Sequence, residues 1–329
     1  MADSIAFLGT GGTIAGSASS PQDNLSYTSG QVALGDLLTA LPGLTERLGG
    51  HGRVVEQVFQ EDSKDLDPGH WETLAARVAH FLSDTQVRGV VITHGTDTLE
   101  ETAYFLARTL PAHLLAAKPV AITCAMRPAT SLWPDGPQNL RDAAVLACTH
   151  QAHGLMVVCQ GQVLDGAQVQ KNHPYQLNPF DAGEYGLVAV VEETQLRLLG
   201  GWPPPVQACA LGLPAGDRAA VTTFPRVEIV FNHNGADGAI VRALCARPLR
   251  GDAPVRGIVL AGTGNGTVHR GLQAALREAQ SQGIAVVRTT RCARGRVLAR
   301  ADGRGEEFPI LALSPVKARI ELMLQLAGR

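Results

Sequence analysis

The chain has 329 residues, 45% of them hydrophobic, and a formal net charge of −2 at pH 7. This length exceeds that of one typical small domain and suits two packed domains with sizeable cores. The near balance of charge gives no electrostatic footprint for nucleic acid or for an anionic membrane surface. No apolar run is long enough to span a bilayer, so we expect no membrane partner.

The spacing of the cysteines and the first four residues predict the cellular compartment of the protein. The six cysteines are widely spaced and form no CxxC pair, which in a chain of this length indicates buried free thiols in a reducing environment. Residues 1–4 carry neither a positive n-region nor an apolar signal core. We therefore expect a cytoplasmic protein, unless a leader has already been removed.

Short β-branched runs alternate with amphipathic segments through most of the chain. Several runs are continuously apolar, as expected for strands buried on both faces of a parallel sheet. The predicted strands are 5–8, 54–59, 89–93, 120–124, 155–159, 227–232, 258–261 and 284–288. Apolar residues recur at helical spacing from Trp71 and from Gly271, and a last helix begins with Ser314 as N-cap and Pro315 in its first turn.

Strands alternating with helices predict an α/β protein. We expect a larger N-terminal domain, residues 1–200, with a mostly parallel sheet flanked by helices. A segment rich in glycine and proline, 201–225, predicts a linker. Residues 226–329 then form a smaller C-terminal α/β domain.

A glycine-rich turn, residues 9–16, directly follows the first predicted strand. It fails the dinucleotide fingerprint because Ile14 stands where a third glycine is needed, and it fails the phosphate-loop pattern because Ser17 replaces the lysine. What remains is a flexible backbone that presents the Thr13 hydroxyl at the carboxyl end of a strand, where open α/β sheets bind ligands. A tight turn with an incidental threonine explains this motif alone equally well.

A second motif ends another buried strand and begins a helix. Thr98 and Glu101 fit a capping box, so part of the motif has a structural explanation. Thr96 and Asp97 precede the cap, where a hydroxyl and a carboxylate can point into one cleft and hold an ammonium group or orient a base. We interpret His94 as a packed loop histidine with no catalytic role.

Two further features, Lys171 and the turn at 264–266, indicate a function only when other functional groups lie beside them. A lone lysine such as Lys171 is normally a solvated charge, but a desolvated lysine beside a threonine can act as a base. The turn at 264–266 follows a buried strand and by itself indicates only a strand-to-helix connection. His150 and His153 form a bare helical pair, and no His or Cys cluster has metal-ligand spacing, so we expect neither a metal nor a cofactor.

Five motifs together resemble bacterial-type L-asparaginases in order and spacing. They are residues 11–16, 94–102, 125–128, 135–137 and 264–266. The resemblance implies that Thr13 is the nucleophile that attacks a side-chain amide carbon, and that Tyr27 activates or positions it from a mobile lid. It also implies that Thr96, Lys171 and Asp97 form a second threonine–base–acid set.

The resemblance implies substrate-binding residues and an assembly as well. Ser63 would bind the substrate α-carboxylate with Lys64 beside it, while Asp97 would hold the α-ammonium group. Asn265 would complete the site of a neighbouring subunit, in homotetramers built of intimate dimers. The partner of such a chain is a small molecule, L-asparagine and possibly L-glutamine.

The sequence departs from the family pattern at two places. Lys64 stands where many relatives carry a neutral or acidic side chain, and a cation there would strengthen carboxylate binding but repel the substrate ammonium group. The acid that pairs with the lid tyrosine across the interface has no clear counterpart, and Asp302, Glu306 and Glu307 are its candidates.

The leading prediction is an amidohydrolase that converts L-asparagine to L-aspartate and ammonia. One alternative is a dual glutaminase-asparaginase. Another is a non-catalytic amino-acid-binding sensor on the same fold. Retention of both threonines with Lys171 and Asp97 favours the enzyme, because binding alone does not require all four groups.

Overall fold

A computed structural model describes residues 3–207, 224–246, 253–299 and 307–328. The chain divides into two compact units, Met1–Gln207 and Ala208–Arg329. All eight strands predicted from the sequence form, with ends displaced by at most three residues. The predicted α/β class is confirmed, with a mostly parallel sheet in the larger unit and a second, smaller α/β unit.

The larger unit is built on one eight-stranded sheet in the order β12-β11-β8-β7-β6-β5-β1-β4. Its elements in chain order are β1 (Ser4–Gly11), the 3-10 helix η1 (Thr13–Ala15), β2 (Ser17–Ala18), β3 (Tyr27–Thr28), α1 (Leu34–Thr39), α2 (Leu44–Arg47), β4 (Gly52–Glu61), η2 (Ser63–Asp65), α3 (Pro68–Ser83), β5 (Val87–Thr93), α4 (Leu99–Thr109), α5 (Ala112–Leu115), β6 (Pro119–Thr123), α6 (Gly136–Cys148), β7 (Gly154–Cys159), β8 (Gln162–Asp165), β9 (Gln170–Lys171), β10 (Phe180–Asp181), η3 (Gly183–Tyr185), β11 (Ala189–Glu192) and β12 (Gln195–Leu198).

The order of the strands creates a switch point between β1 and β5. Strands β4, β1, β5, β6 and β7 pair in parallel, whereas β8, β11 and β12 pair antiparallel at one edge. The chain leaves β1 for β4 on one side and then returns past β1 to β5 on the other. In open α/β sheets such a reversal leaves a crevice at the carboxyl ends of the two strands, where ligands bind.

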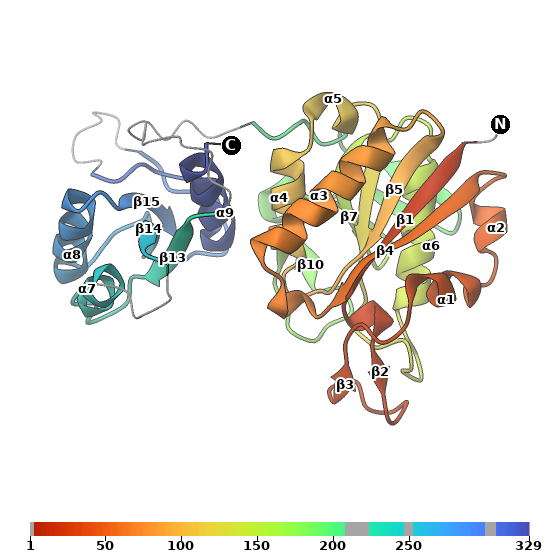
Figure 1. The fold of residues 1–329 in the computed structure, drawn as a ribbon, viewed down its shortest axis with the longest axis horizontal. Helices are drawn as coiled ribbons and strands as arrows, with labels where there is room; N and C mark the ends of the chain where they lie inside the picture. Colours follow the sequence, from red (N-terminus) through yellow and green to blue (C-terminus); the bar gives the residue numbers. More distant parts are fainter. Residues whose placement is uncertain (1–2, 208–223, 247–252, 300–306, 329) are drawn as a thin grey trace. The chain divides into compact units, whose positions relative to one another are not determined.

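Helices cover both faces of this sheet (Figure 1). Helices α3 and α4 pack on one face, and α6 packs on the other together with α1. Ile5, Phe7 and Val91 point toward α6 and form one core cluster with Leu140 and Ala144. Since the intervening strand residues are buried against α3 and α4, both faces of the central strands are apolar, which explains their continuous hydrophobic runs.

The capping box predicted for Thr98 and Glu101 is wrong. Thr98 occupies the N-cap position of α4, but within the described part of the chain its side chain makes no capping hydrogen bond. Its hydroxyl donates instead to the Ser63 carbonyl at 2.7 Å. A capping box does form at the start of α3, where Asp67 and His70 each bond the backbone of the other. The Thr98 hydroxyl therefore connects two turns rather than closing its own helix.

The smaller unit is a three-stranded sheet in the order β13-β14-β15, with both pairs parallel. Helix α9 packs across all three strands, while α7 and α8 pack together and α8 contacts β15. Ser314 and Pro315 begin α9 as predicted, although the Ser314 side chain makes no capping hydrogen bond within the described residues. The elements are β13 (Arg226–Phe231), α7 (Ala239–Cys245), β14 (Val255–Gly262), α8 (Arg270–Ser281), β15 (Ala285–Thr290) and α9 (Pro315–Leu326).

Most of the predicted linker, residues 201–225, lies outside the described residues, and its described part, 201–207, contains neither helix nor strand. The five cysteines in the described ranges are free thiols, and Cys209 lies outside them. In the part of the chain that the structure describes, every helix is too short or too polar to cross a bilayer.

Helix α6 carries a buried carboxyl group, that of Asp142. Burial raises the pKa of this group from 3.8 to about 6, against the opposing effects of a hydrogen bond from Gln138 and of the charges on Arg141 and Arg47. The Gln138 side chain donates to it at 2.7 Å. Ionised Asp142 therefore destabilises the folded chain.

We expect the stability of the protein to depend on the ionisation of Asp142. The folded-state pKa lies above the unfolded value, so this group stabilises the fold below pH 3.8 and loses that contribution as the pH rises through 6. Asp142→Asn should raise the free energy of unfolding by about 1–3 kcal/mol more at pH 8 than at pH 4. Urea denaturation at both pH values measures the difference, with exposed Asp36→Asn as the control. An equal effect of Asp142→Asn at the two pH values would contradict the assignment.

Candidate active site

Two turns follow β1 and β5 at the switch point of the larger unit. The strands run in register up to their ends, with Gly9 opposite Thr93. The hydroxyl of Thr10 donates to the Thr93 carbonyl at 2.8 Å and fixes the two strand ends together. The turn after β1 carries Thr13 and the turn after β5 carries Thr96, so the topology brings both predicted hydroxyls to one edge of the sheet.

The backbones of these turns touch at two glycines. A Cβ placed on Gly12 would lie 2.3 Å from the Cα of Gly95, and one placed on Gly95 would lie 2.5 Å from the Oγ of Ser63. Side chains at either position would separate the turns. Thr13, Thr96 and Ser63 are 6%, 5% and 3% exposed. Three buried hydroxyl-bearing residues that are distant in sequence thus lie on adjoining turns.

Thr13 is hydrogen-bonded to Tyr27. The hydroxyl oxygens of Thr13 and Tyr27 are 2.6 Å apart, and Tyr27 reaches this position from the short β2–β3 hairpin. Gly16 leaves room for the ring, because a Cβ there would lie 2.9 Å from its edge. Burial raises the pKa of Tyr27, the bond to Thr13 lowers it, and the negative charges of Asp97 and Asp62 raise it further. The phenol therefore keeps its proton at neutral pH.

Thr96, Lys171 and Asp97 form a second hydrogen-bonded set. The Lys171 ammonium group donates to the Thr96 hydroxyl at 2.9 Å and to the Asp97 carboxylate at 2.6 Å. Lys171 arrives on β9, which pairs with β10. Its side chain is 14% exposed, whereas that of Asp97 is 58% exposed. Asp97 can therefore hold the lysine with one oxygen and offer the other to a ligand.

Lys64 is surrounded by acids rather than free. Its ammonium group lies 3.0 Å from an Asp62 oxygen and 2.6 Å from an Asp65 oxygen. These carboxylates raise the pKa of Lys64 and compensate its charge. The repulsion of a substrate ammonium group expected from the sequence is therefore weakened by two neighbouring negative charges.

A hydrogen bond that the sequence does not predict links the segment after β3 to the Ser63 turn. The hydroxyl of Ser29, two residues after Tyr27, donates to the Asp62 carboxylate at 3.1 Å. Asp62 also caps η2 by accepting from the Lys64 backbone. An aspartate directly before a short turn is a signal for such a cap, but the partner of its second oxygen is 33 residues away.

Two other residues in the family motifs have structural roles. His94 is fully buried, and burial lowers its pKa to about 4, so it is uncharged at neutral pH. Its Nδ1 lies 2.7 Å from the Gly95 carbonyl. The Asp135 carboxylate accepts hydrogen bonds from the backbone of Met126 at 3.0 Å and of Arg127 at 2.9 Å, which fixes the turn after β6.

Asn265 lies in the smaller unit, on an exposed turn. Its side-chain amide donates to the Leu298 carbonyl at 3.0 Å and accepts from the Leu298 N–H at 2.8 Å. These bonds hold the turn at 264–266 against a neighbouring loop of the same unit. The contribution of Asn265 to another subunit stays a prediction.

Of the three candidates for the acid partner of Tyr27, the structure describes only Glu307. Asp302 and Glu306 lie outside the described residues. The Glu307 carboxylate is bound by Arg277 and by Gln273 of α8. The Arg277 guanidinium group lowers its pKa. Glu307 thus already has partners within its own unit.

Comparisons with known proteins show what the whole chain is similar to. Residues 4–202 match the family model "Asparaginase, N-terminal", and residues 226–329 match "Glutaminase/Asparaginase C-terminal domain". L-asparaginase 2 of Escherichia coli (strain K12) is 35% identical over 327 residues, which cover 98% of this chain and 88% of that protein. A glutaminase-asparaginase of Pseudomonas fluorescens biotype A is 31% identical, over 98% of this chain and 86% of that protein.

A solved structure shares the fold as well as the sequence. The crystal structure of a probable cytoplasmic L-asparaginase from Campylobacter jejuni matches with a TM-score of 0.85 and 31% identity, over 99% of this chain and 96% of that one. Two matched domains and a fold shared over almost the full length define an asparaginase-type α/β protein. The chain belongs to the asparaginase family, and the resemblance found in its sequence is confirmed.

We expect Gly12→Ala to separate the two threonine turns. Gly12 has φ 79° and ψ −172°, a backbone conformation that is almost restricted to glycine and costs other residues about 1–3 kcal/mol. The added methyl group also collides with the Gly95 backbone. The melting temperature should therefore fall by several degrees. Gly35→Ala is the control, because its added Cβ would meet no described atom within 4 Å. Equal melting temperatures for the two variants would contradict the contact.

Proposed function

We propose that the chain hydrolyses the side-chain amide of L-asparagine to give L-aspartate and ammonia. The observation that carries the proposal is the convergence of two activated hydroxyls, Thr13 beside Tyr27 and Thr96 beside Lys171, on turns in direct contact. An amide requires a nucleophile, a proton donor for the leaving ammonia and stabilisation of an oxyanion. The relatives named L-asparaginase support the choice of substrate.

In the proposed acylation, the Thr13 oxygen attacks the amide carbon of the substrate. The C–N bond then breaks, and ammonia leaves after it has taken up the proton released by the threonine. A β-aspartyl ester on Thr13 remains. Tyr27, protonated and 2.6 Å from the attacking oxygen, orients the hydroxyl and relays its proton. We propose that backbone N–H groups at the two threonine turns stabilise the developing oxyanion.

In the proposed deacylation, water attacks the ester and regenerates the free Thr13 hydroxyl with release of L-aspartate. Thr96 positions this water, and Lys171 acts on the Thr96 hydroxyl to which it is bonded. Asp97 orients Lys171 through a charge-assisted hydrogen bond. Neither step requires a metal or a cofactor.

We further propose how the amino-acid end of the substrate is held. Ser63 binds the α-carboxylate, and the exposed oxygen of Asp97 binds the α-ammonium group. Lys64 belongs to this end of the site, where it keeps the carboxylates of Asp62 and Asp65 from repelling the α-carboxylate.

A dual glutaminase-asparaginase is the second candidate. The observation in its favour is that relatives with this name match over nearly the same length as those named L-asparaginase, with 31% and 32% identity. The ratio of kcat/KM for L-asparagine to that for L-glutamine separates the two functions. Binding of either amino acid without ammonia release would instead indicate a sensor.

We propose a cytoplasmic homotetramer built of intimate dimers, or at least an intimate homodimer. Asn265 would complete the site of a neighbouring subunit, and residues 226–329 would contribute to the interface. The relative from Campylobacter jejuni is described as cytoplasmic, while one from Haemophilus influenzae is described as periplasmic. Sedimentation analysis of the purified chain tests the assembly.

Both threonines should be required for turnover. Thr13→Ala removes the nucleophile and Thr96→Val removes the hydroxyl that positions water, so each should lower kcat for L-asparagine by at least about a thousandfold. A coupled ammonia assay measures the rates. Thr39→Val changes an exposed threonine and should leave kcat unchanged. Near-parental activity of either active-site variant would rule out the proposed mechanism.

Lys64→Gln should weaken substrate binding rather than slow the chemistry. Without the ammonium group, the carboxylates of Asp62 and Asp65 face the substrate α-carboxylate without compensation. We expect KM for L-asparagine to rise about three- to tenfold with little change in kcat, an effect on binding alone. Lys118→Gln, whose lysine donates to the Asp84 carbonyl, is the control. A lower KM for Lys64→Gln would show that the cation repels the substrate.

A further inference from the structure

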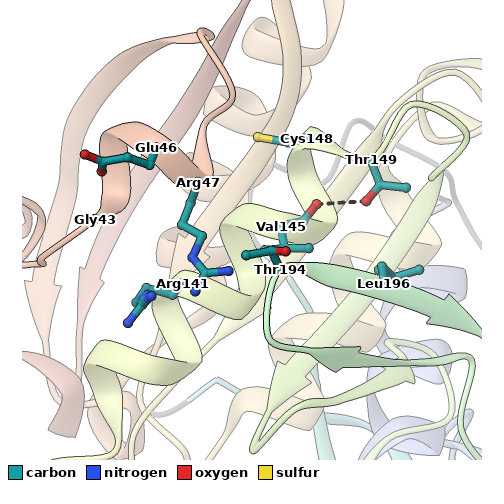
Figure 2. A pocket seen from close by; sticks show the side chains of 9 residues that line it. All are labelled: Gly43, Glu46, Arg47, Arg141, Val145, Cys148, Thr149, Thr194 and Leu196. Atoms are coloured by element: carbon teal, nitrogen blue, oxygen red, sulfur yellow. Dashed lines mark hydrogen bonds between the residues drawn. The ribbon is translucent and has the colours of Figure 1, made fainter.

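A pocket lies on helix α6, away from the threonine turns (Figure 2). Its volume is about 610 Å³. Helix α6 begins at Gly136, where an added Cβ would lie 2.8 Å from Ile14 of the catalytic turn. Its later residues, including Val145 and Cys148, line the pocket together with the end of α2 and the β11–β12 hairpin. The pocket therefore shares a helix with the active site but not its residues.

Two arginines give this pocket its charge. Arg47 extends from α2 and Arg141 from α6, and Figure 2 shows both guanidinium groups on the same side of the pocket. Arg47 donates to the Glu193 carbonyl at 2.8 Å, which orients its side chain. The Nε of Arg141 is buried and has no hydrogen-bond partner among the residues that the structure describes.

The nearby acids offset the charge of these cations only in part. Within the described ranges, neither guanidinium group forms an ion pair within 4.0 Å. The Glu46 carboxylate turns back over Gly43 and points away from the arginines in Figure 2. Asp142 is buried and accepts a hydrogen bond from Gln138, and the charges of Arg141 and Arg47 lower its pKa without an ion-pair contact. Two positive charges thus face one hollow with unused hydrogen-bond donors.

We propose that this pocket binds a small organic dianion, held between the guanidinium groups of Arg47 and Arg141. Guanidinium groups bind carboxylate and phosphate oxygens through paired N–H donors. Val145 and Leu196 offer apolar contact to a short carbon chain, and the Thr194 side chain also lines the pocket. A dicarboxylate and a phosphate ester share this chemistry. Either would connect α2, α6 and the hairpin, which all contribute to the pocket.

Cys148 provides a reporter inside the pocket. It is half-buried, and burial raises its pKa to about 11, so iodoacetamide at pH 9 reacts with it slowly. Exposed Cys292 in the smaller unit is an internal reference. The full-length chain is alkylated with increasing succinate or inorganic phosphate, and both cysteine peptides are quantified by mass spectrometry. Neutral succinamide and sodium chloride of equal ionic strength are the controls.

We expect at least one of the two anions to slow alkylation of Cys148 along a saturating curve, by about tenfold at ten times its dissociation constant. Cys292 should be unaffected. Arg141→Gln and, independently, Arg47→Gln should abolish this protection, while Arg197→Gln on the same hairpin should keep it. The anion that protects Cys148 at the lower concentration shows whether the ligand is a dicarboxylate or a phosphate ester. Protection by succinamide, protection that persists in both pocket variants, or no protection by either anion would overturn the proposal.

Discussion

The site depends on one steric constraint, the contact between the backbones of Gly12 and Gly95. The sheet order places the ends of β1 and β5 side by side, but only glycines allow the following turns to touch. This contact sets the separation of Thr13 and Thr96, and Gly95 also leaves room for Ser63. The constraint explains why the turns that carry Thr13, Thr96 and Ser63 lie against one another.

The two threonines beside this contact have different surroundings. Burial keeps the Tyr27 phenol protonated, so it can hydrogen-bond to Thr13 without carrying a charge. Lys171 is largely enclosed and bonded to Thr96, whereas Asp97 remains open to solvent on one side. One threonine is thus bonded to a phenol, and the other to a lysine that a carboxylate holds in turn. This asymmetry suits a reaction in which one hydroxyl attacks and the other handles water.

The sequence was sufficient for the parallel strands and for the two threonine turns, because both follow from local patterns of apolar runs and glycines. It did not predict the antiparallel edge strands β8, β11 and β12, which lack such apolar runs. It was insufficient where a side chain chooses a partner that is distant in the chain. Thr98 fits a local cap, yet its hydroxyl bonds to Ser63, 35 residues away. Lys64 looked like an isolated cation because charge compensation depends on side-chain geometry. Arg47 and Arg141 gave no joint signal, since only the packing of α2 on α6 brings them to one pocket.

The most direct test of the proposed chemistry is to locate the covalent intermediate. Lys171→Met removes the group that acts on Thr96 and should slow deacylation more than acylation. This variant is mixed with L-asparagine, quenched in acid and digested for peptide mass mapping. We expect a β-aspartyl ester on Thr13, formed together with a burst of about one equivalent of ammonia. An ester on Thr96, or the same burst with Thr13 unmodified, would contradict the assignment of Thr13 as the nucleophile.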